Sequence, residues 1–220
     1  MQLRDDAFPR PMNWFADRFR KGPKPLYWWR PGPNHPLGIS SNIGDELNRT
    51  LYVWLTGKEP RRATEQVRGK VMAIGSILHN AQPGDVVWGS GLNGRVQDGN
   101  GEIRLPKRLE TIQFKAVRGP LTRQLLVDAG ADVPEIYGDP ALLVRKFVKP
   151  PAERRGTLVF PHYTDMSLLL EQWDHPSETL VWNAEASVES TIAAINASER
   201  VVSSALHGII LADALGVPVV

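Results

Sequence analysis

The sequence contains no cysteine, and this absence removes several kinds of chemistry. Without thiols the chain has no disulfides, no thiolate metal ligands and no cysteine nucleophile. A chain without cysteine is typical of a reducing compartment, and its first residues lack the apolar core of a signal peptide. These two features predict a cytoplasmic protein.

Long apolar runs are also missing, since no stretch approaches the roughly 18 consecutive apolar residues of a membrane-spanning helix. An N-terminal arm alternates aromatic with basic residues, which suits a membrane surface. Its aromatic residues are Trp14, Phe15, Phe19, Tyr27, Trp28 and Trp29, and its basic residues are Arg18, Arg20, Lys21, Lys24 and Arg30. Four prolines up to Pro25 interrupt any long amphipathic helix. We therefore expect the arm to pack on its own domain, with peripheral contact at the inner face of the cytoplasmic membrane as the alternative.

The chain has little net charge and few metal ligands. Lys and Arg number 26 against 24 Asp and Glu, giving +2, which is far from the excess of a protein that neutralises nucleic-acid phosphates. We therefore expect no nucleic-acid partner. The five histidines are His35, His79, His162, His175 and His207. No pair has the helical i, i+4 spacing of a metal site, so we expect no metal.

Apolar strand patterns alternate with helical ones along the chain, which predicts an α/β fold with mainly parallel sheets. The double proline at Pro150-Pro-Ala-Glu-Arg-Arg reads as a linker. We expect two Rossmann-like domains, an N-terminal one over residues 1–150 and the start of a C-terminal one over residues 151–220. The second is short and closes on a strand, so we expect it to be incomplete.

The last twenty residues read as a strand, a tight turn, a helix and a strand. Ser204 is suited to cap a helix over residues 205–215, which Gly216 would end. His207 would then lie in the first turn, where unpaired backbone N–H groups and the helix dipole favour an anion. The alternative is that His207 packs or caps locally.

Three further features lie where strands give way to helices. Asp45 falls in the first turn of a helix that Gly57 ends, either as a helix cap or as a carboxylate at the mouth of a parallel sheet. Gly89-Ser-Gly, which includes Ser90, would let a ligand approach the backbone or would form a simple turn. Arg118 follows a strand and precedes Pro120, the expected first residue of a helix; it is either a fork for a carboxylate or phosphate or a solvated loop arginine.

Five short motifs occur in one order along the chain. They are Asn42-Ile-Gly-Asp-Glu-Leu, Gly89-Ser-Gly, Val117-Arg-Gly-Pro-Leu-Thr, Gly138-Asp-Pro-Ala and Ser203-Ser-Ala-Leu-His-Gly-Ile-Ile. In that order, over residues 40–220, the chain resembles the polysaccharide pyruvyl transferase family, and most closely its exopolysaccharide ketal-pyruvate branch. The resemblance implies the two-domain architecture of the B-type glycosyltransferases, with acceptor recognition in the N-terminal domain and the donor in the cleft.

The resemblance implies phosphoenolpyruvate as the donor and a cyclic pyruvate ketal, formed on two hydroxyls of a saccharide or lipid-linked oligosaccharide, as the product. Phosphoenolpyruvate is then a co-substrate, and no cofactor is expected. We expect His207 as the acid or phosphate contact, and His162 or Asp45 as the group that activates the acceptor. The expected donor-binding residues are Asn42, Gly44, Ser90, Arg118, Ser204, Leu206, His207 and Gly208.

The chain departs from the family pattern at two points. Many members have Arg-Leu-His-Gly where this chain has Ala205-Leu-His-Gly, so Arg118, Arg95 or a lysine would have to supply the missing cation. Family chains also continue past Val217-Pro-Val-Val, which is why we expect an incomplete second domain.

Two other functions remain as alternatives. A glycosyltransferase of the same architecture would need a carboxylate for the ribose of a nucleotide sugar, and Glu185 or Glu189 is the nearby residue. An inactive binding fragment is the other. A dinucleotide-binding oxidoreductase is disfavoured because no Gly-rich fingerprint follows the first strand.

Overall fold

The computed structural model describes residues 24–32, 34–35, 39, 41–172, 179–182 and 186–220. The chain forms two compact units, one of Met1–Trp29 with Asn48–Pro140 and one of Arg30–Leu47 with Ala141–Val220. The division runs through helix α2 (Ile43–Thr56), so the first turn of this helix belongs to the second unit. The predicted boundary near residue 150, with an acceptor side before it and a donor side after it, stays a prediction.

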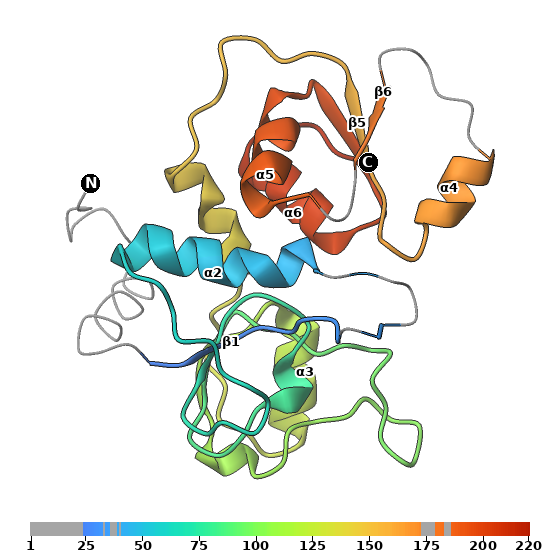
Figure 1. Ribbon diagram of the computed structural model, residues 1–220. Helices are drawn as coiled ribbons and strands as arrows, with labels where there is room; N and C mark the ends of the chain where they lie inside the picture. The colour runs from blue at the N-terminus through green and yellow to red at the C-terminus, as the bar shows by residue number, and fades with distance from the viewer. Residues whose placement is uncertain (1–23, 33, 36–38, 40, 173–178, 183–185) are drawn as a thin grey trace. The chain divides into compact units, whose positions relative to one another are not determined.

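The first unit is built on a four-stranded parallel sheet in the order β1-β2-β3-β4. Figure 1 labels its first strand, β1, and its helix α3. The strands are β1 (Leu26–Tyr27), β2 (Val71–Met72), β3 (Val86–Trp88) and β4 (Gln113–Ala116). Helix α3 (Pro120–Asp128) packs on it through Leu126, which is buried in one hydrophobic core with Val87 and Val117. Short 3-10 helices occupy Leu78–Asn80 and Leu109–Thr111.

The second unit holds a three-stranded parallel sheet in the order β6-β5-β7. Its strands are β5 (Thr157–Phe160), β6 (Thr179–Val181) and β7 (Arg200–Ser203). Its helices are α4 (Met166–Gln172), α5 (Val188–Ala197) and α6 (Leu206–Ala214), and a 3-10 helix spans Pro140–Lys146. Val219 adds a single parallel bridge beside Val201, where a last strand was predicted. The α/β class with parallel sheets is therefore confirmed.

Local sequence signals explain most helix ends. Pro120 occupies the first turn of α3, as predicted, and the side chain of Ser187 caps α5 by accepting a hydrogen bond from the Ser190 N–H. The predicted cap of α6 is wrong. Ala205 stands at the N-cap and has no side-chain acceptor, and the oxygen of the preceding Ser204 accepts from the His162 N–H instead.

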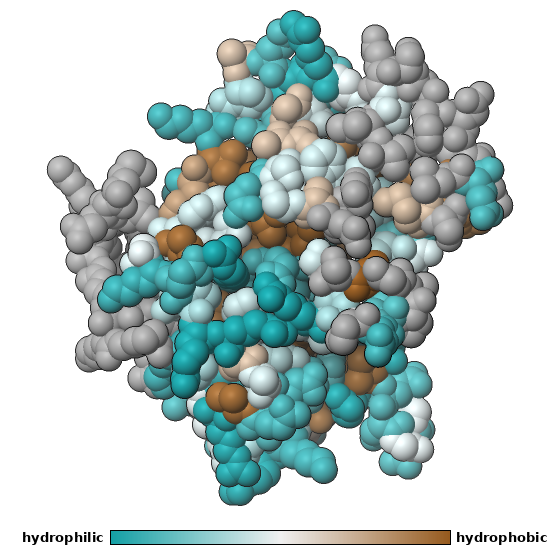
Figure 2. Space-filling model, viewed as in Figure 1, coloured by the Kyte–Doolittle hydropathy of each residue, from teal (hydrophilic) through white to brown (hydrophobic). Residues whose placement is uncertain are grey.

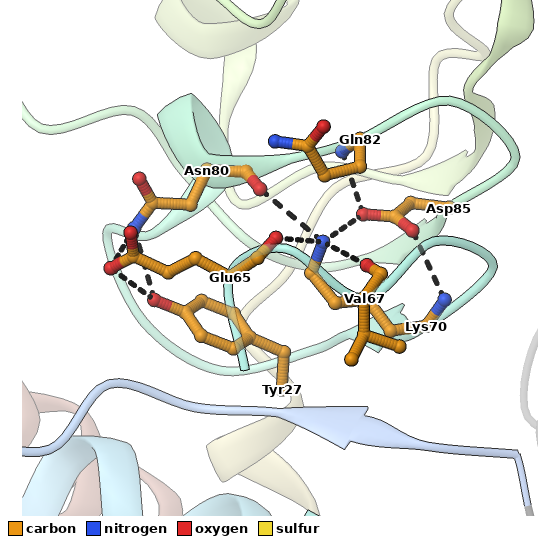
Figure 3. Close-up of polar contacts among 7 residues, drawn as sticks. All are labelled: Tyr27, Glu65, Val67, Lys70, Asn80, Gln82 and Asp85. Carbon is orange, nitrogen blue, oxygen red and sulfur yellow. Dashed lines mark hydrogen bonds and ion pairs between the residues drawn. The ribbon is translucent and has the colours of Figure 1, made fainter. Parts of the chain in front are cut away.

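A buried ion pair fixes the amino ends of β2 and β3 (Figure 3). Lys70 and Asp85 are fully buried, and the Lys70 ammonium donates to Asp85 and to the backbone carbonyls of Glu65, Val67 and Asn80. Asp85 also accepts from the backbone N–H groups of Lys70 and Gln82. Burial raises the pKa of Asp85 and lowers the pKa of Lys70, and the hydrogen bond between them opposes both shifts.

The predicted membrane-facing arm falls largely outside the described residues, because Trp14, Phe15, Phe19 and the basic residues up to Lys21 precede residue 24. Of its described aromatic residues, Tyr27 and Trp28 are buried. Among the described residues, no helix is both long enough and apolar enough to cross a membrane. On the face drawn in Figure 2, hydrophobic residues appear as separate patches among hydrophilic ones.

We expect Lys70→Met to be strongly destabilising, because it leaves the Asp85 carboxylate buried without its counter-ion. The free energy of unfolding in urea should fall by about 3–5 kcal/mol. Lys58→Met is the matched control, since Lys58 is exposed, and it should change that free energy by less than about 0.5 kcal/mol. Equal effects of the two substitutions would contradict a structural role for the ion pair.

Candidate functional site

The carboxyl ends of β5 and β7 carry several of the predicted site residues. The two strands are parallel neighbours, with Phe160 opposite Ser203, so the turns that follow them meet at one edge of the sheet. His162 lies in the turn after β5, and Ser204 lies in the turn between β7 and α6. Open α/β sheets bind ligands at this edge.

Ser204 ties the two turns together. Its hydroxyl donates to Oδ2 of Asp165 over 2.7 Å and accepts from the backbone N–H of His162 over 2.9 Å. Asp165 lies directly before α4, and its own N–H donates to the carbonyl of His162 over 2.9 Å. The Ser204 oxygen thus accepts from the His162 N–H rather than from the first turn of α6, and the helix begins with Ala205 at its N-cap.

The imidazole of His162 is held by its own turn. Its Nδ1 lies 2.7 Å from Oγ1 of Thr164, and Thr164 donates its hydroxyl to Oδ1 of Asp165 over 2.8 Å. The ring of Tyr163 lies 4.1 Å from that of His162 between centroids, and His35 packs edge-on against Tyr163. His162 is therefore held by the ring of Tyr163, which packs against its own ring, and by the hydroxyl of Thr164 at Nδ1.

The tight turn into α6 depends on Ser203 and Gly208. The Ser203 hydroxyl donates to the carbonyl of Phe160 over 2.6 Å and accepts from the N–H of Ala205 over 3.1 Å. A Cβ on Gly208 would lie 2.3 Å from Oγ of Ser203 and 2.6 Å from Cδ1 of Phe160. Gly208 thus lets the first turn of α6 press directly on the ends of β5 and β7.

His207 lies in the first turn of α6, as predicted, and its ring covers the first turn of α2. A Cβ built on Gly44 would lie 2.0 Å from Nδ1 of His207 and 2.6 Å from its Cγ. Asn42 starts α2 by accepting a hydrogen bond from the Gly44 N–H on its Oδ1, over 3.0 Å. The amino ends of two helices therefore meet at one half-buried histidine, and both favour an anion.

Two carboxylates follow Gly44 in α2 and have different surroundings. Asp45 is buried, with 7% of its surface exposed. Glu46 forms a two-pronged ion pair with Arg30, and this hydrogen bonding raises the pKa of Arg30. The guanidinium of Arg30 is therefore bound to a carboxylate in the first turn of α2.

Arg118 and Ser90 belong to the first unit, at the carboxyl ends of β4 and β3. The guanidinium of Arg118 lies over Gly91, where a Cβ would be 2.5 Å from Nη2, and it donates to Oγ of Ser76 over 2.9 Å. Ser90 is fully buried and donates to the carbonyl of Ala73 over 3.0 Å. The backbone space expected for a ligand at Gly91 is thus occupied by Arg118 itself.

The structure brings seven predicted residues together in the second unit: Asn42, Gly44, His162, Ser204, Leu206, His207 and Gly208. Leu206 is 44% exposed at the start of α6, and Asp45 follows Gly44 in the same helical turn. Sequence reasoning missed Thr164, Asp165 and Ser76. A weak signal existed for two of them, since Thr164 and Asp165 follow a strand that ends at a predicted site histidine.

The described residues hold no group of three or more histidine, aspartate and glutamate side chains arranged to bind a metal ion. Glu189, the described candidate for a ribose carboxylate, is exposed in the first turn of α5, and Glu185 lies outside the described residues.

Comparison with known families decides the wider relationship. A sequence model of the polysaccharide pyruvyl transferase family matches residues 71–220, which is well over half of the chain. The chain belongs to this family. The predicted family is confirmed, and the matched residues include every site residue from Ser90 onward, whereas the ketal-pyruvate branch stays a prediction. No curated protein matches the sequence.

This pyruvyl transferase family member also has a fold relative among solved structures. A protein of uncharacterised function from Klebsiella pneumoniae aligns with a TM-score of 0.52 at 13% identity, over 96% of this chain and 88% of that chain. At this identity the likeness shows a shared fold alone.

We expect Gly44→Ala to be destabilising because of His207. Alanine in a helix is ordinarily about 0.5–1 kcal/mol more stable than glycine. Here the added methyl group overlaps the imidazole ring, so the free energy of unfolding should instead fall by about 1–3 kcal/mol. In a His207→Ala background the same substitution should cost nothing.

Gly94→Ala is the control, since a Cβ there meets nothing within 4 Å. Chemical denaturation of the two single variants and the double variant gives the coupling energy. Additive effects at Gly44 and His207 would show that the ring does not cover Gly44.

Proposed function

We propose that the protein transfers pyruvate from phosphoenolpyruvate to two hydroxyls of a sugar, forming a cyclic ketal in a bacterial surface polysaccharide. The observation that carries the proposal is the placement of His207, in a member of the polysaccharide pyruvyl transferase family, at the meeting point of the first turns of α2 and α6. An anionic donor fits this position because both helix amino ends attract negative charge.

The donor carries a phosphate and a carboxylate, and each unit has candidates for binding them. In the second unit these are His207 and Gly208 with the turn of Ser204 and Leu206, and the start of α2 at Asn42 and Gly44. In the first unit the candidate is Arg118, whose backbone N–H donates to the carbonyl of the fully buried Ser90. Because the chain has Ala205 where many family members have arginine, we assign the compensating cation to Arg118, whose fork suits a carboxylate or phosphate.

Ketal formation moves two protons. Two acceptor hydroxyls lose one proton each as their oxygens bond to C2 of the donor. One proton goes to the methylene carbon, which becomes a methyl group. The second goes to the phosphate, which leaves with the oxygen that joined it to C2. His207 is the proposed acid or phosphate contact, and His162 or Asp45 is the proposed base for the acceptor. Arginine and helix amino ends can neutralise the phosphate, so the scheme needs neither a metal nor a cofactor.

The architecture and location are part of the same proposal. Each parallel sheet would belong to a Rossmann-like domain, arranged as in the B-type glycosyltransferases, with residues 1–150 serving the acceptor and residues 151–220 the donor. The acceptor would be a saccharide or lipid-linked oligosaccharide, used in the cytoplasm at the inner face of the membrane.

The first test is donor binding, measured as a shift in Tm. Phosphoenolpyruvate should raise the Tm, and the shift should shrink in the His207→Asn and Arg118→Lys variants, because binding to the folded state stabilises it. A panel of nucleotide sugars serves as the comparison. Stabilisation by a nucleotide sugar alone would favour a glycosyltransferase and overturn the proposal.

The second test is turnover, measured as phosphate release from phosphoenolpyruvate with lipid-linked oligosaccharide acceptors. His207→Asn should lower kcat by about 10²–10⁴-fold, the usual contribution of a general acid. His175→Asn is the matched control, since the proposal gives His175 no role, and it should leave kcat unchanged. Donor binding without turnover by the unaltered chain would favour a binding protein.

A further inference from the structure

We propose that Thr164 and Asp165 are positioning residues that fix the tautomer of His162, so that Nδ1 carries the proton and Nε2 is the basic nitrogen. The inference deepens the proposed function, on which its catalytic meaning rests, because it names the atom of His162 that takes the acceptor proton.

The direction of the hydrogen bonds follows from what each group can donate. The Asp165 carboxylate only accepts, and it receives the hydroxyls of Thr164 at 2.8 Å and Ser204 at 2.7 Å, one on each oxygen. Thr164 has a single hydroxyl proton, and that proton is given to Asp165. Toward Nδ1 of His162, at 2.7 Å, Thr164 must therefore accept, so Nδ1 is the protonated nitrogen.

One contact points the other way and is weaker. The backbone N–H of Thr164 approaches the same Nδ1 at 3.4 Å, which would suit an unprotonated nitrogen. This distance lies beyond the usual 2.7–3.2 Å of an N–H donor, whereas the contact with the hydroxyl lies within it. An unprotonated Nδ1 would also require a protonated Asp165, although this carboxylate already accepts two hydroxyl hydrogen bonds.

The arrangement also supports the positive charge that a base acquires. When Nε2 takes the proton of an acceptor hydroxyl, whose oxygen bonds to C2 of the donor, His162 becomes an imidazolium with a proton on each nitrogen. Its Nδ1–H then donates to the Thr164 hydroxyl, which itself donates to the negatively charged carboxylate of Asp165. A carboxylate that orients a histidine through its second nitrogen is a known way to set the tautomer, and here a hydroxyl stands between the two.

Contacts with Ser204 and Tyr163 hold the turn of His162, Thr164 and Asp165 in place. Ser204 accepts from the backbone N–H of His162 and donates to Asp165, so it links the first and last residues of the chain of hydrogen bonds from His162 through Thr164 to Asp165. The ring of Tyr163 packs on that of His162. Ser204, which we expected as a helix cap, is thereby reassigned to support of His162.

The direct test is the tautomer of His162 by NMR of ¹⁵N-labelled protein, with His162→Gln to assign its ring resonances. At a pH where the imidazole is neutral, Nε2 should resonate as an unprotonated nitrogen and Nδ1 as a protonated one. Thr164→Val should give a mixture of the two tautomers, and Thr164→Ser, which keeps the hydroxyl, should restore the single one. A protonated Nε2 in the unaltered protein would overturn the inference.

Thr111→Val is the matched control, because Thr111 is a half-buried threonine whose hydroxyl also donates to a carbonyl within its own turn. It should leave the His162 resonances unchanged. If Thr164→Val also left them unchanged, Thr164 would have no role in the tautomer.

Turnover gives a second readout. Thr164→Val should lower kcat by roughly 10–100-fold, the range seen for partners that orient metal-bound histidines, with little change in KM for phosphoenolpyruvate. Thr164→Ser should recover most of the loss. An unaltered protein that shows the expected tautomer but releases no phosphate would contradict the proposed function and leave the assignment of Thr164 intact. Equal kcat in the two Thr164 variants would contradict the role of the hydroxyl.

Discussion

The close approach of the His207 ring to Gly44 is the constraint on which the second unit depends. Only a residue without a side chain permits this approach, because a Cβ at Gly44 would overlap the imidazole. It sets the first turn of α2 against the first turn of α6, with the His207 ring at the amino ends of both helices. The histidine, the glycine and the Asn42 cap thus form one arrangement, which is why we assign it to the anionic donor.

The first unit shows how differently the two ends of a parallel sheet are used. At the amino ends of β2 and β3, Lys70 and Asp85 are fully buried and bonded to each other and to nearby backbone groups. At the carboxyl ends, Arg118 donates a hydrogen bond to Ser76, and its guanidinium occupies the space that a side chain at Gly91 would fill. The first arrangement holds strands in place, and the second holds a guanidinium at the edge where such sheets bind ligands.

The sequence predicted what depends on neighbours along the chain. The strand around Val86, the helix starting at Pro120 and the Ser187 cap follow from local propensity and capping, and the structure confirms them. The Ser204 cap failed because its oxygen accepts from the N–H of His162, which is remote in sequence. The contact of Gly44 with His207 was hidden for the same reason, since no local pattern reports which helix ends meet. Motif order identified the family and most of the candidate site residues, whereas the partners that orient them required the fold.

The proposed function requires an anion to bind at the start of α6. The most direct measurement follows the backbone amide resonances of His207 and Gly208 by NMR as phosphoenolpyruvate is added to the full chain. Both resonances should shift in a saturable way, and inorganic phosphate should shift them more weakly because it lacks the carboxylate. Resonances that stay in place with phosphoenolpyruvate but shift with a nucleotide sugar would contradict the proposed function.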